Sequence, residues 1–455
     1  MRRQMVKFLC SVGIIIASIY SVLTLRKIRA KYGAFHEELV NGILTETYFT
    51  NQIREVQQVT TVHKQESFDT PVGPNPLQNG TDINDMICKR FYERSNILNT
   101  ACSASKERQT YSDCDEKAVK QNLKYSKKSN IMYCAIEKAG STFWKRILYV
   151  LGEEGSVSNP THIKTIEAEY SKERFCDMSD NNWEEIEKVL AMSTSIMFVR
   201  DPYARLFSAW LDKFYSPNII YWNSTGQVIA KSQRKVFTGG CICDITFTEF
   251  VNHTVDEILS GNKCVDRHFS PNYKHCNPCK LTYDYIGKYE TMKEDTLYIL
   301  NALNLKENVT FTQFDEDAAF DAIKDAADWV FYQRDKISEC GLSFTCAMFR
   351  VWQRLQSRGV ISNSIPFPFL SGKITITRDD FETALRTAHS DSNHDELKCN
   401  RKEAMSQALT SLPEHVRQKT IQAFRRDFDL FGYDREPEIE EYVENKYFEK
   451  CPPDI

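Results

Sequence analysis

The sequence lacks an excess of charge of either sign. Its 455 residues hold 58 lysines and arginines against 62 aspartates and glutamates, which leaves a formal net charge of −4. This balance gives no global sign of nucleic-acid binding, so we expect no nucleic acid as a partner. A polyanionic ligand would need a local basic groove, which the overall charge does not exclude.

Two common functional motifs are also missing. A Walker A loop needs Gly-x-x-x-x-Gly-Lys followed by Ser or Thr, and residues 137–142 do not supply this pattern. Residues 276–279 form a Cys-x-x-Cys pair, but the chain has no second such pair to complete a zinc site. We therefore expect no metal, and we interpret this pair, together with Cys241 and Cys243, as disulfide-forming. The last two lie so close together that each should bond a distant partner.

One segment of the chain has the pattern of an anion-binding loop between a strand and a helix. Residues 131–136 are a continuous apolar run, which predicts a strand buried on both faces. In the loop that follows, Lys138 adds a positive charge, Gly140 lets the backbone approach a ligand, and Ser141 or Thr142 can start a helix. The first N–H groups of a helix lack partners, so this loop is expected to bind an anion.

A second strand–loop–helix unit follows. The apolar run 195–199 leads into Arg200, then into Asp201 as a helix N-cap and Pro202 as the first helical residue. Arg200 stands where strand becomes helix and can grip an anion through two parallel hydrogen bonds. Ser208 lies farther along the predicted helix. Two cationic loops of this kind predict one ligand that carries at least two separate anionic groups.

At these two loops the sequence resembles the Golgi carbohydrate sulfotransferases of the chondroitin/dermatan 4-O-sulfotransferase type. The resemblance runs from about residue 130 to 300 and resumes from about 412 to 433, whereas residues 301–411 match this family poorly. Further matching blocks are residues 267–271, 276–279, 283–291 and 426–433.

The resemblance implies an α/β, P-loop-like sulfotransferase fold with a central, mainly parallel sheet. It also implies 3′-phosphoadenylyl sulfate as the co-substrate, with its 5′-phosphosulfate in the first loop and its 3′-phosphate at the second. The implied binding residues are Lys138, Ala139, Gly140, Ser141, Thr142 and Phe143 in the first loop, and Arg200 and Ser208 in the second unit. The implied reaction transfers a sulfonate group to a sugar hydroxyl of a glycosaminoglycan or glycoprotein glycan. The leading acceptor is the 4-hydroxyl of N-acetylgalactosamine in chondroitin or dermatan.

Sulfonate transfer needs stabilisation of the leaving phosphate oxygen and a base for the acceptor hydroxyl. We assign the electrostatic role to Lys138. Histidine has the natural pKa for a base, and His268 and His162 are the two candidates. His268 lies in a matching block, and His162 lies between the two loops. Glu290 is a third possibility.

The N-terminal part predicts a membrane anchor. Residues 8–25 form an uncharged, mainly apolar run just long enough to span a bilayer, with a cleaved signal peptide as the alternative. The resemblance favours a single-pass type II Golgi membrane protein with a cytoplasmic tail (1–7), a signal-anchor (8–25), a lumenal stem (26–85) and a lumenal sulfotransferase domain (86–455). Fourteen cysteines outside the anchor and four glycosylation sequons agree with a lumenal body. The sequons are at Asn79, Asn223, Asn252 and Asn308.

Two other functions stay open at this point. One is a catalytically inactive lumenal glycan-binding protein on the same fold, and the other is a nucleotide-dependent glycan kinase. Loss of Lys138, Arg200 or Ser208 would favour the first, and all three are present. The missing Walker A pattern argues against the second.

Overall fold

The computed structural model describes residues 83–104, 111–152, 157–171, 174–236, 239–261, 264–370, 375–437, 439 and 446–452. The chain divides into the units Met1–Val72 and Gly73–Ile455, and all described residues belong to the second. The predicted tail, anchor and nearly all of the stem lie outside the described residues. Within those residues, the helices are all too short or too polar to cross a bilayer.

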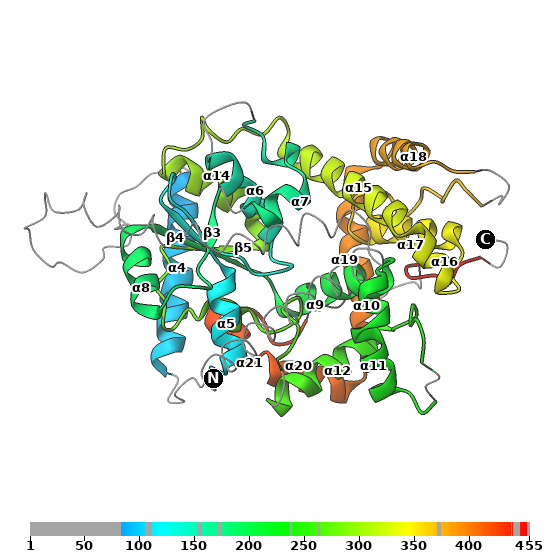
Figure 1. The fold of residues 1–455 in the computed structure, drawn as a ribbon, viewed down its shortest axis with the longest axis horizontal. Coiled ribbons are helices and arrows are strands. Elements are labelled where there is room, and N and C mark those ends of the chain that lie inside the picture. The colour runs from blue at the N-terminus through cyan, green and yellow to red at the C-terminus, as the bar shows by residue number, and fades with distance from the viewer. Residues whose placement is uncertain are drawn as a thin grey trace, which may run out of the picture. The chain divides into compact units, whose positions relative to one another are not determined.

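A five-stranded sheet stands at one side of this unit, in the order β3-β1-β2-β4-β5 (Figure 1). The strands are β1 (Leu123–Ser126), β2 (Ile131–Cys134), β3 (Cys176–Asp177), β4 (Thr194–Val199) and β5 (Tyr285–Lys288). The apolar runs predicted as strands are found as β2, which ends two residues early, and β4. Both are almost completely buried, as a strand covered on two faces must be.

The sheet is mixed, so the expected parallel pairing is found in only part of it. β2 pairs with β4 and β4 with β5 in parallel, but β1 runs antiparallel to both β2 and β3. The reason is the short link between β1 and β2, which spans residues 127–130 and contains Asn130 at a φ of +52°. A link of this length can close a hairpin but cannot make the crossover that a parallel pair requires.

Helices pack around the sheet and bury its apolar faces. Trp144 of α6 lies against Tyr133 of β2 and Phe198 of β4, with ring centroids 5.6 and 5.3 Å away. This tryptophan is completely buried and belongs to the core. The elements on this side are α4 (Ile83–Ala104), α5 (Asp113–Asn122), α6 (Ser141–Leu151), η2 (Pro160–His162), α7 (Thr165–Tyr170), α8 (Trp183–Met192), η4 (Tyr289–Thr291) and α14 (Met292–Ala302).

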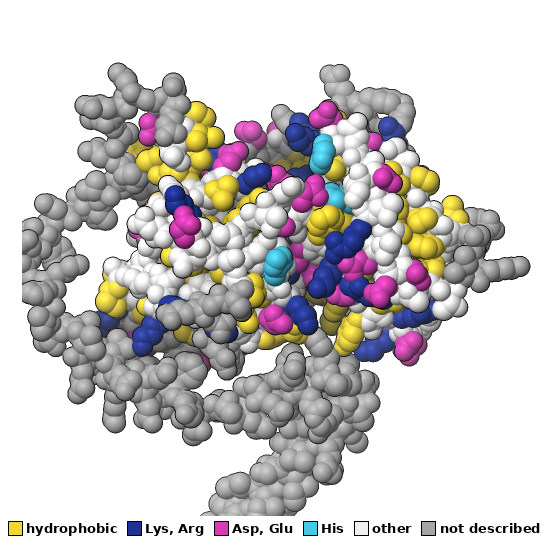
Figure 2. Space-filling view, turned by 90° about the horizontal axis from the view of Figure 1, so that it is seen from above, with side chains coloured by type: hydrophobic (Ala, Val, Ile, Leu, Met, Phe, Trp, Pro, Cys, Tyr) yellow, Lys and Arg dark blue, Asp and Glu magenta, His cyan; other side chains and the backbone are white. Residues whose placement is uncertain are grey.

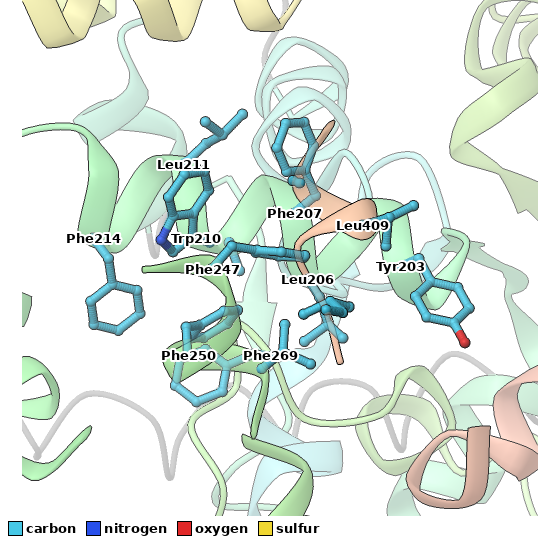
Figure 3. Packing of buried hydrophobic residues seen from close by; sticks show 14 of the residues in the cluster. Tyr203, Leu206, Phe207, Trp210, Leu211, Phe214, Phe247, Phe250, Phe269 and Leu409 are labelled. Carbon is cyan, nitrogen blue, oxygen red and sulfur yellow. The ribbon is translucent and has the colours of Figure 1, made fainter. Parts of the chain in front are cut away.

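The rest of the unit is helical and has two further cores. The first surrounds α9, whose side chains Phe207 and Trp210 pack on Phe247 (Figure 3). The second joins α15, α16, α17 and α18. These helices are α9 (Pro202–Trp210), η3 (Leu211–Tyr215), α10 (Ile219–Asn223), α11 (Thr225–Gln233), α12 (Phe247–Ser260), α13 (Asn272–Cys276), α15 (Phe314–Tyr332), α16 (Arg334–Glu339), α17 (Phe344–Ser357), α18 (Arg378–Ser390), α19 (His394–Thr410), α20 (Glu414–Ala423) and α21 (Arg425–Phe431).

α9 connects the two sides. It begins directly after β4, at the edge of the sheet where β2 also ends, and continues into the π-helical turn η3. The far end contacts α17 and α19, so Figure 1 shows α9 between the sheet and the helices of residues 314–410. Side chains from three distant parts of the sequence can therefore meet along α9 and η3.

Candidate active site

The first loop lies between β2 and α6 and leaves the start of the helix open. Lys138 and Gly140 have φ angles of +65° and +88°, and no side chain caps α6 among the described residues. A Cβ added at Gly140 would lie 2.3 Å from the Cε of Met292, so only glycine fits there without a shift. The first amides of α6 are thereby available to an anion. The hydroxyl of Thr142 donates to Glu169 at 3.0 Å.

Lys138 lies in a group of charges centred on Asp212. The Lys138 Nζ is 3.0 Å from the Asp212 Oδ2, the Lys213 Nζ is 3.2 Å from the same oxygen, and the Arg354 Nη2 is 3.5 Å from Oδ1. Burial lowers the pKa of Lys138 to about 8, although Asp212 acts in the opposite direction. Burial also opposes ionisation of Asp212, yet Lys138 and Lys213 hold its pKa well below the usual range. We call Lys138, Asp212, Lys213 and Arg354 the Asp212 cluster.

Arg200 lies beside the first loop. Its Nη1 donates to the backbone oxygen of Lys138 at 3.1 Å, and its guanidinium carbon is 4.2 Å from the ring centroid of Tyr289. The Nε atom is buried without a hydrogen-bond partner, and Arg200 forms no ion pair with a carboxylate of the described residues. Asp201 caps α9 through the amide of Ala204, as predicted. The arginine therefore keeps bonding capacity for an anion.

Ser208 is half-buried on α9, one helical turn before Asp212. Within the described part of the chain its hydroxyl has no hydrogen-bond partner. Its spacing places it on the same face of the helix as Asp212.

His268 is held by a carboxylate and a phenol. Its Nδ1 lies 2.8 Å from the Asp266 Oδ1 and 2.8 Å from the Tyr221 hydroxyl, which donates to Asp266 Oδ2 at 2.8 Å. Because an ionised carboxylate only accepts, Nδ1 carries the proton and Nε2 holds a free lone pair. Burial lowers the pKa of His268, although the hydrogen-bonded Asp266 opposes this effect. The imidazole is therefore neutral near pH 7.

His268 is linked to Lys138 through the Asp212 cluster. The Lys213 ammonium lies 4.9 Å from the ring centroid of Tyr221, the residue that contacts His268. The same ammonium pairs with Asp212, which pairs with Lys138. One of the two candidate bases is thus connected to the lysine of the first loop through Tyr221, Lys213 and Asp212.

The other two candidates for the base have different surroundings. His162 ends η2, is exposed, and its side chain makes no hydrogen bond within the described residues. Both oxygens of Glu290 are occupied, one by the Asp201 amide at 3.0 Å and the other by the Tyr433 hydroxyl at 3.0 Å. Glu290 therefore positions the start of α9.

A buried network fixes the two loops relative to each other. The Nε of Arg205 donates to the backbone oxygen of Glu137 at 2.8 Å, and its Nη2 donates to that of Arg267 at 2.9 Å. The Glu137 carboxylate pairs with Arg267 and lies 3.5 Å from the His275 Nδ1. Although burial acts to raise it, the charge of Arg267 lowers the pKa of Glu137. These contacts explain how the loop of six residues between β2 and α6 keeps its shape.

Disulfides close the chain around this network, as predicted for residues 276–279. Cys276 bonds Cys134 at the end of β2, and Cys279 bonds Cys102. Cys241 bonds the distant Cys340, also as predicted, but Cys243 is free, so that part of the prediction was wrong. The remaining pairs are Cys114–Cys264 and Cys346–Cys451. The described residues contain no group of side chains arranged to hold a metal ion.

Sequence reasoning missed most of the side chains around Lys138. Asp212, Lys213, Tyr221 and Asp266 belong to no motif that the sequence shows. Arg354 comes from α17, inside the stretch that matches the family poorly. These pairings join segments that are distant in the sequence, so no local sequence pattern predicts them.

Comparison with known proteins agrees with the two loops. Residues 121–330 match the profile of a family described as "Sulfotransferase family". This segment includes Lys138, Arg200, Ser208 and His268 and is similar to that family, whereas Arg354 lies beyond it. No solved structure matches the chain.

The similar curated proteins are carbohydrate sulfotransferases. Carbohydrate sulfotransferase 11 of Rattus norvegicus is 31% identical over 188 residues, which are 40% of this chain and 53% of that protein. Carbohydrate sulfotransferase 9 of Homo sapiens is 33% identical over 190 residues, 41% of this chain and 42% of that protein. Carbohydrate sulfotransferase 14 of Danio rerio is 31% identical over 211 residues, 44% and 53% respectively. The chain spans about half the length of the curated relatives it matches.

Proposed function

We propose that this protein is a carbohydrate sulfotransferase that uses 3′-phosphoadenylyl sulfate. The observation that carries the proposal is the adjacency of the two anion loops. They follow the neighbouring parallel strands β2 and β4, and the Arg200 Nη1 lies 3.1 Å from the backbone oxygen of Lys138. A single ligand with two anionic groups can reach both loops, and ligands of this kind bind at the carboxyl ends of parallel strands.

The residues present fit such a donor. We assign the 5′-phosphosulfate to the uncapped start of α6 with Lys138, and the 3′-phosphate to Arg200 and Ser208. The buried, unpartnered Nε of Arg200 and the open amides of α6 support this assignment. The donor, when bound, supplies the sulfonate group and a phosphate leaving group.

The chain's own residues complete the reaction. As the acceptor oxygen forms its bond to sulfur and the sulfur–phosphate oxygen bond breaks, the hydroxyl proton passes to the Nε2 of His268. Asp266 and Tyr221 hold the imidazole in the tautomer that this step requires. Lys138 neutralises the negative charge that develops on the leaving oxygen. His162 has no comparable support, so we rank it second as the base.

The acceptor and the location belong to the same proposal. We assign a sugar hydroxyl of a glycosaminoglycan or glycoprotein glycan, with the 4-hydroxyl of N-acetylgalactosamine in chondroitin or dermatan as the specific site. We place the protein in the Golgi membrane as a type II protein with residues 8–25 as its anchor. The exposed Asn223 and Asn308 are accessible to glycosylation, whereas Asn252 lies in α12 and donates to Gln233 at 2.7 Å.

The test is transfer of label from radioactive 3′-phosphoadenylyl sulfate by the full-length protein to a panel of glycans. We expect chondroitin or dermatan to become labelled, and we expect chondroitin-degrading enzymes to release this label. Label that survives those enzymes but is freed as sulfotyrosine by proteolysis would contradict a glycan acceptor. Glycan binding without any transfer or donor binding would support the inactive glycan-binding protein instead.

A further inference from the structure

The Asp212 cluster holds more positive than negative charge. Lys138, Lys213 and Arg354 all pair with Asp212, and these cations are only 19%, 15% and 14% exposed. The next carboxylate that influences Arg354 is Asp325, which lies 3.8 Å from Arg146. One carboxylate shared by three poorly hydrated cations leaves their charge incompletely balanced, which favours a further anion at this place.

Arg354 has the clearest unused bonding capacity. Its Nη1 donates to the Ser216 hydroxyl at 3.3 Å and its Nη2 lies at the long distance of 3.5 Å from Asp212. Its Nε is buried without a hydrogen-bond partner within the described residues. A planar guanidinium with five donors is matched best by a carboxylate or sulfate, which it can bind through two bonds.

The position of Lys213 puts the positive charge of the Asp212 cluster on the side of His268, where we expect the acceptor hydroxyl. Its ammonium lies over the ring of Tyr221, whose hydroxyl contacts the His268 imidazole. The donor's anionic groups already have the uncapped start of α6 and Arg200. Lys213 and Arg354 are therefore left for a group that lies next to the hydroxyl facing His268.

The face drawn in Figure 2 does not supply this charge. On the face drawn in Figure 2, lysine and arginine side chains are interspersed with aspartate and glutamate side chains. Preference for an acidic ligand must then come from a local group of cations.

We propose that Lys213 and Arg354 form an anion subsite that binds a carboxylate or sulfate of the acceptor beside its reactive hydroxyl, and that this subsite selects acidic over neutral glycans. The inference rests on the proposed sulfotransferase function. It gives α17, which lies outside the segment shared with the sulfotransferase family, a role in choosing the acceptor. Asp212 keeps the two cations together until the acceptor arrives.

The experiment measures initial rates of the full-length protein with unsulfated chondroitin and with the same polymer after reduction of its carboxyl groups. The wild-type protein should prefer the acidic polymer. Arg354→Gln should raise the KM for chondroitin by about tenfold to a hundredfold, because one charge-assisted contact is lost. The KM for the reduced polymer and for the donor should stay near the wild-type values, and Arg354→Lys should recover part of the loss.

Arg386→Gln is the matched control. Arg386 pairs with Glu382 on α18, so this variant removes the same charge without touching the Asp212 cluster and should behave like the wild type. If Arg354→Gln does not unfold cooperatively on heating, Lys213→Gln takes its place, since Lys213 pairs with Asp212 from the other side.

Three outcomes would overturn the subsite. One is an equal loss with both polymers, which indicates a structural effect. Another is a rise in the donor KM in place of the acceptor KM. The third is a wild-type protein that sulfates neutral and acidic polymers equally well, which leaves the sulfotransferase proposal standing. Absence of both transfer and binding of adenosine 3′,5′-bisphosphate would instead remove the sulfotransferase proposal itself.

Discussion

The pH dependence of the reaction gives a direct test of the Lys138–Asp212 pair. Lys138 must be charged to stabilise the leaving group, and burial lowers its pKa to about 8. Activity should therefore fall as the pH rises through about 8. His268 must be neutral to accept a proton, and its pKa is lowered, so activity should be lost on the acid side only below the ordinary histidine pKa of about 6.5. We expect a plateau between these two limbs.

Replacing Asp212 by asparagine should move the alkaline limb toward acid. The carboxylate favours the charged form of Lys138, and without it the repulsion from Lys213 and Arg354 is no longer opposed, so the pKa of Lys138 falls. Opposite charges 3.0 Å apart interact by about 5.5 kcal/mol at an effective dielectric constant of ~20. Asp212 shares its charge among three cations, and both side chains are partly exposed. We therefore expect about a quarter of that energy, ~1.4 kcal/mol or one pKa unit.

The assay is kcat/KM for the donor at a low, fixed acceptor concentration, measured from acid to alkaline pH, because most of the enzyme is then free and the ratio reports the pKa values of the free enzyme. Asp256→Asn is the control, since Asp256 pairs with Lys419 at an exposed position away from the Asp212 cluster. An alkaline limb that stays in place in Asp212→Asn, or moves to higher pH, would refute the reasoning. A wild-type profile without any alkaline limb near pH 8 would refute the same reasoning before a variant is tested.

Three further predictions concern single positions. Lys138→Ala should lower kcat by about a hundredfold or more, whereas Arg200→Ala should mainly raise the donor KM. Initial rates measured at varied donor concentration separate these two effects. Full activity in either variant would show that the replaced residue does not belong to the site. His268→Ala should still bind the donor in calorimetry but should lose turnover by about a hundredfold or more. His162→Ala should remain active. The reverse pattern would make His162 the base. Gly140→Ala should lose stability by about 1–2 kcal/mol from its φ of +88° alone and should weaken donor binding; an unchanged melting temperature would contradict the assigned loop geometry.

The two loops were predictable from sequence because their signals are local. A buried strand needs a continuous apolar run, and residues 131–136 and 195–199 supply one each. The turn into α6 needs a glycine where φ is positive, and the start of α9 needs a capping Asp201. Each of these requirements is met by residues within a few positions of the element they shape.

The mixed sheet was missed because strand direction depends on the connection. β1 has a half-buried pattern of four residues, which is too short to stand out by periodicity. The hairpin that makes it antiparallel depends on the link of residues 127–130. A parallel arrangement of β2 and β4 was expected and is found, and the antiparallel edge does not disturb the two loops.

The side chains around Lys138 could not be predicted, because their meeting depends on how α9 and η3 sit against α17. Asp212 reaches Lys138 across a sequence separation of 74 residues, and Arg354 reaches Asp212 from a different core. Only the fold brings these three side chains within ion-pair distance. The consequence is functional as well as architectural. The loops that match the sulfotransferase family hold the residues to which we assign the donor, whereas the charge that we assign to the acceptor is completed by a helix outside that match. A segment that diverges in sequence from its relatives is then the expected place for a difference in acceptor, because it can change one arginine without altering the donor site.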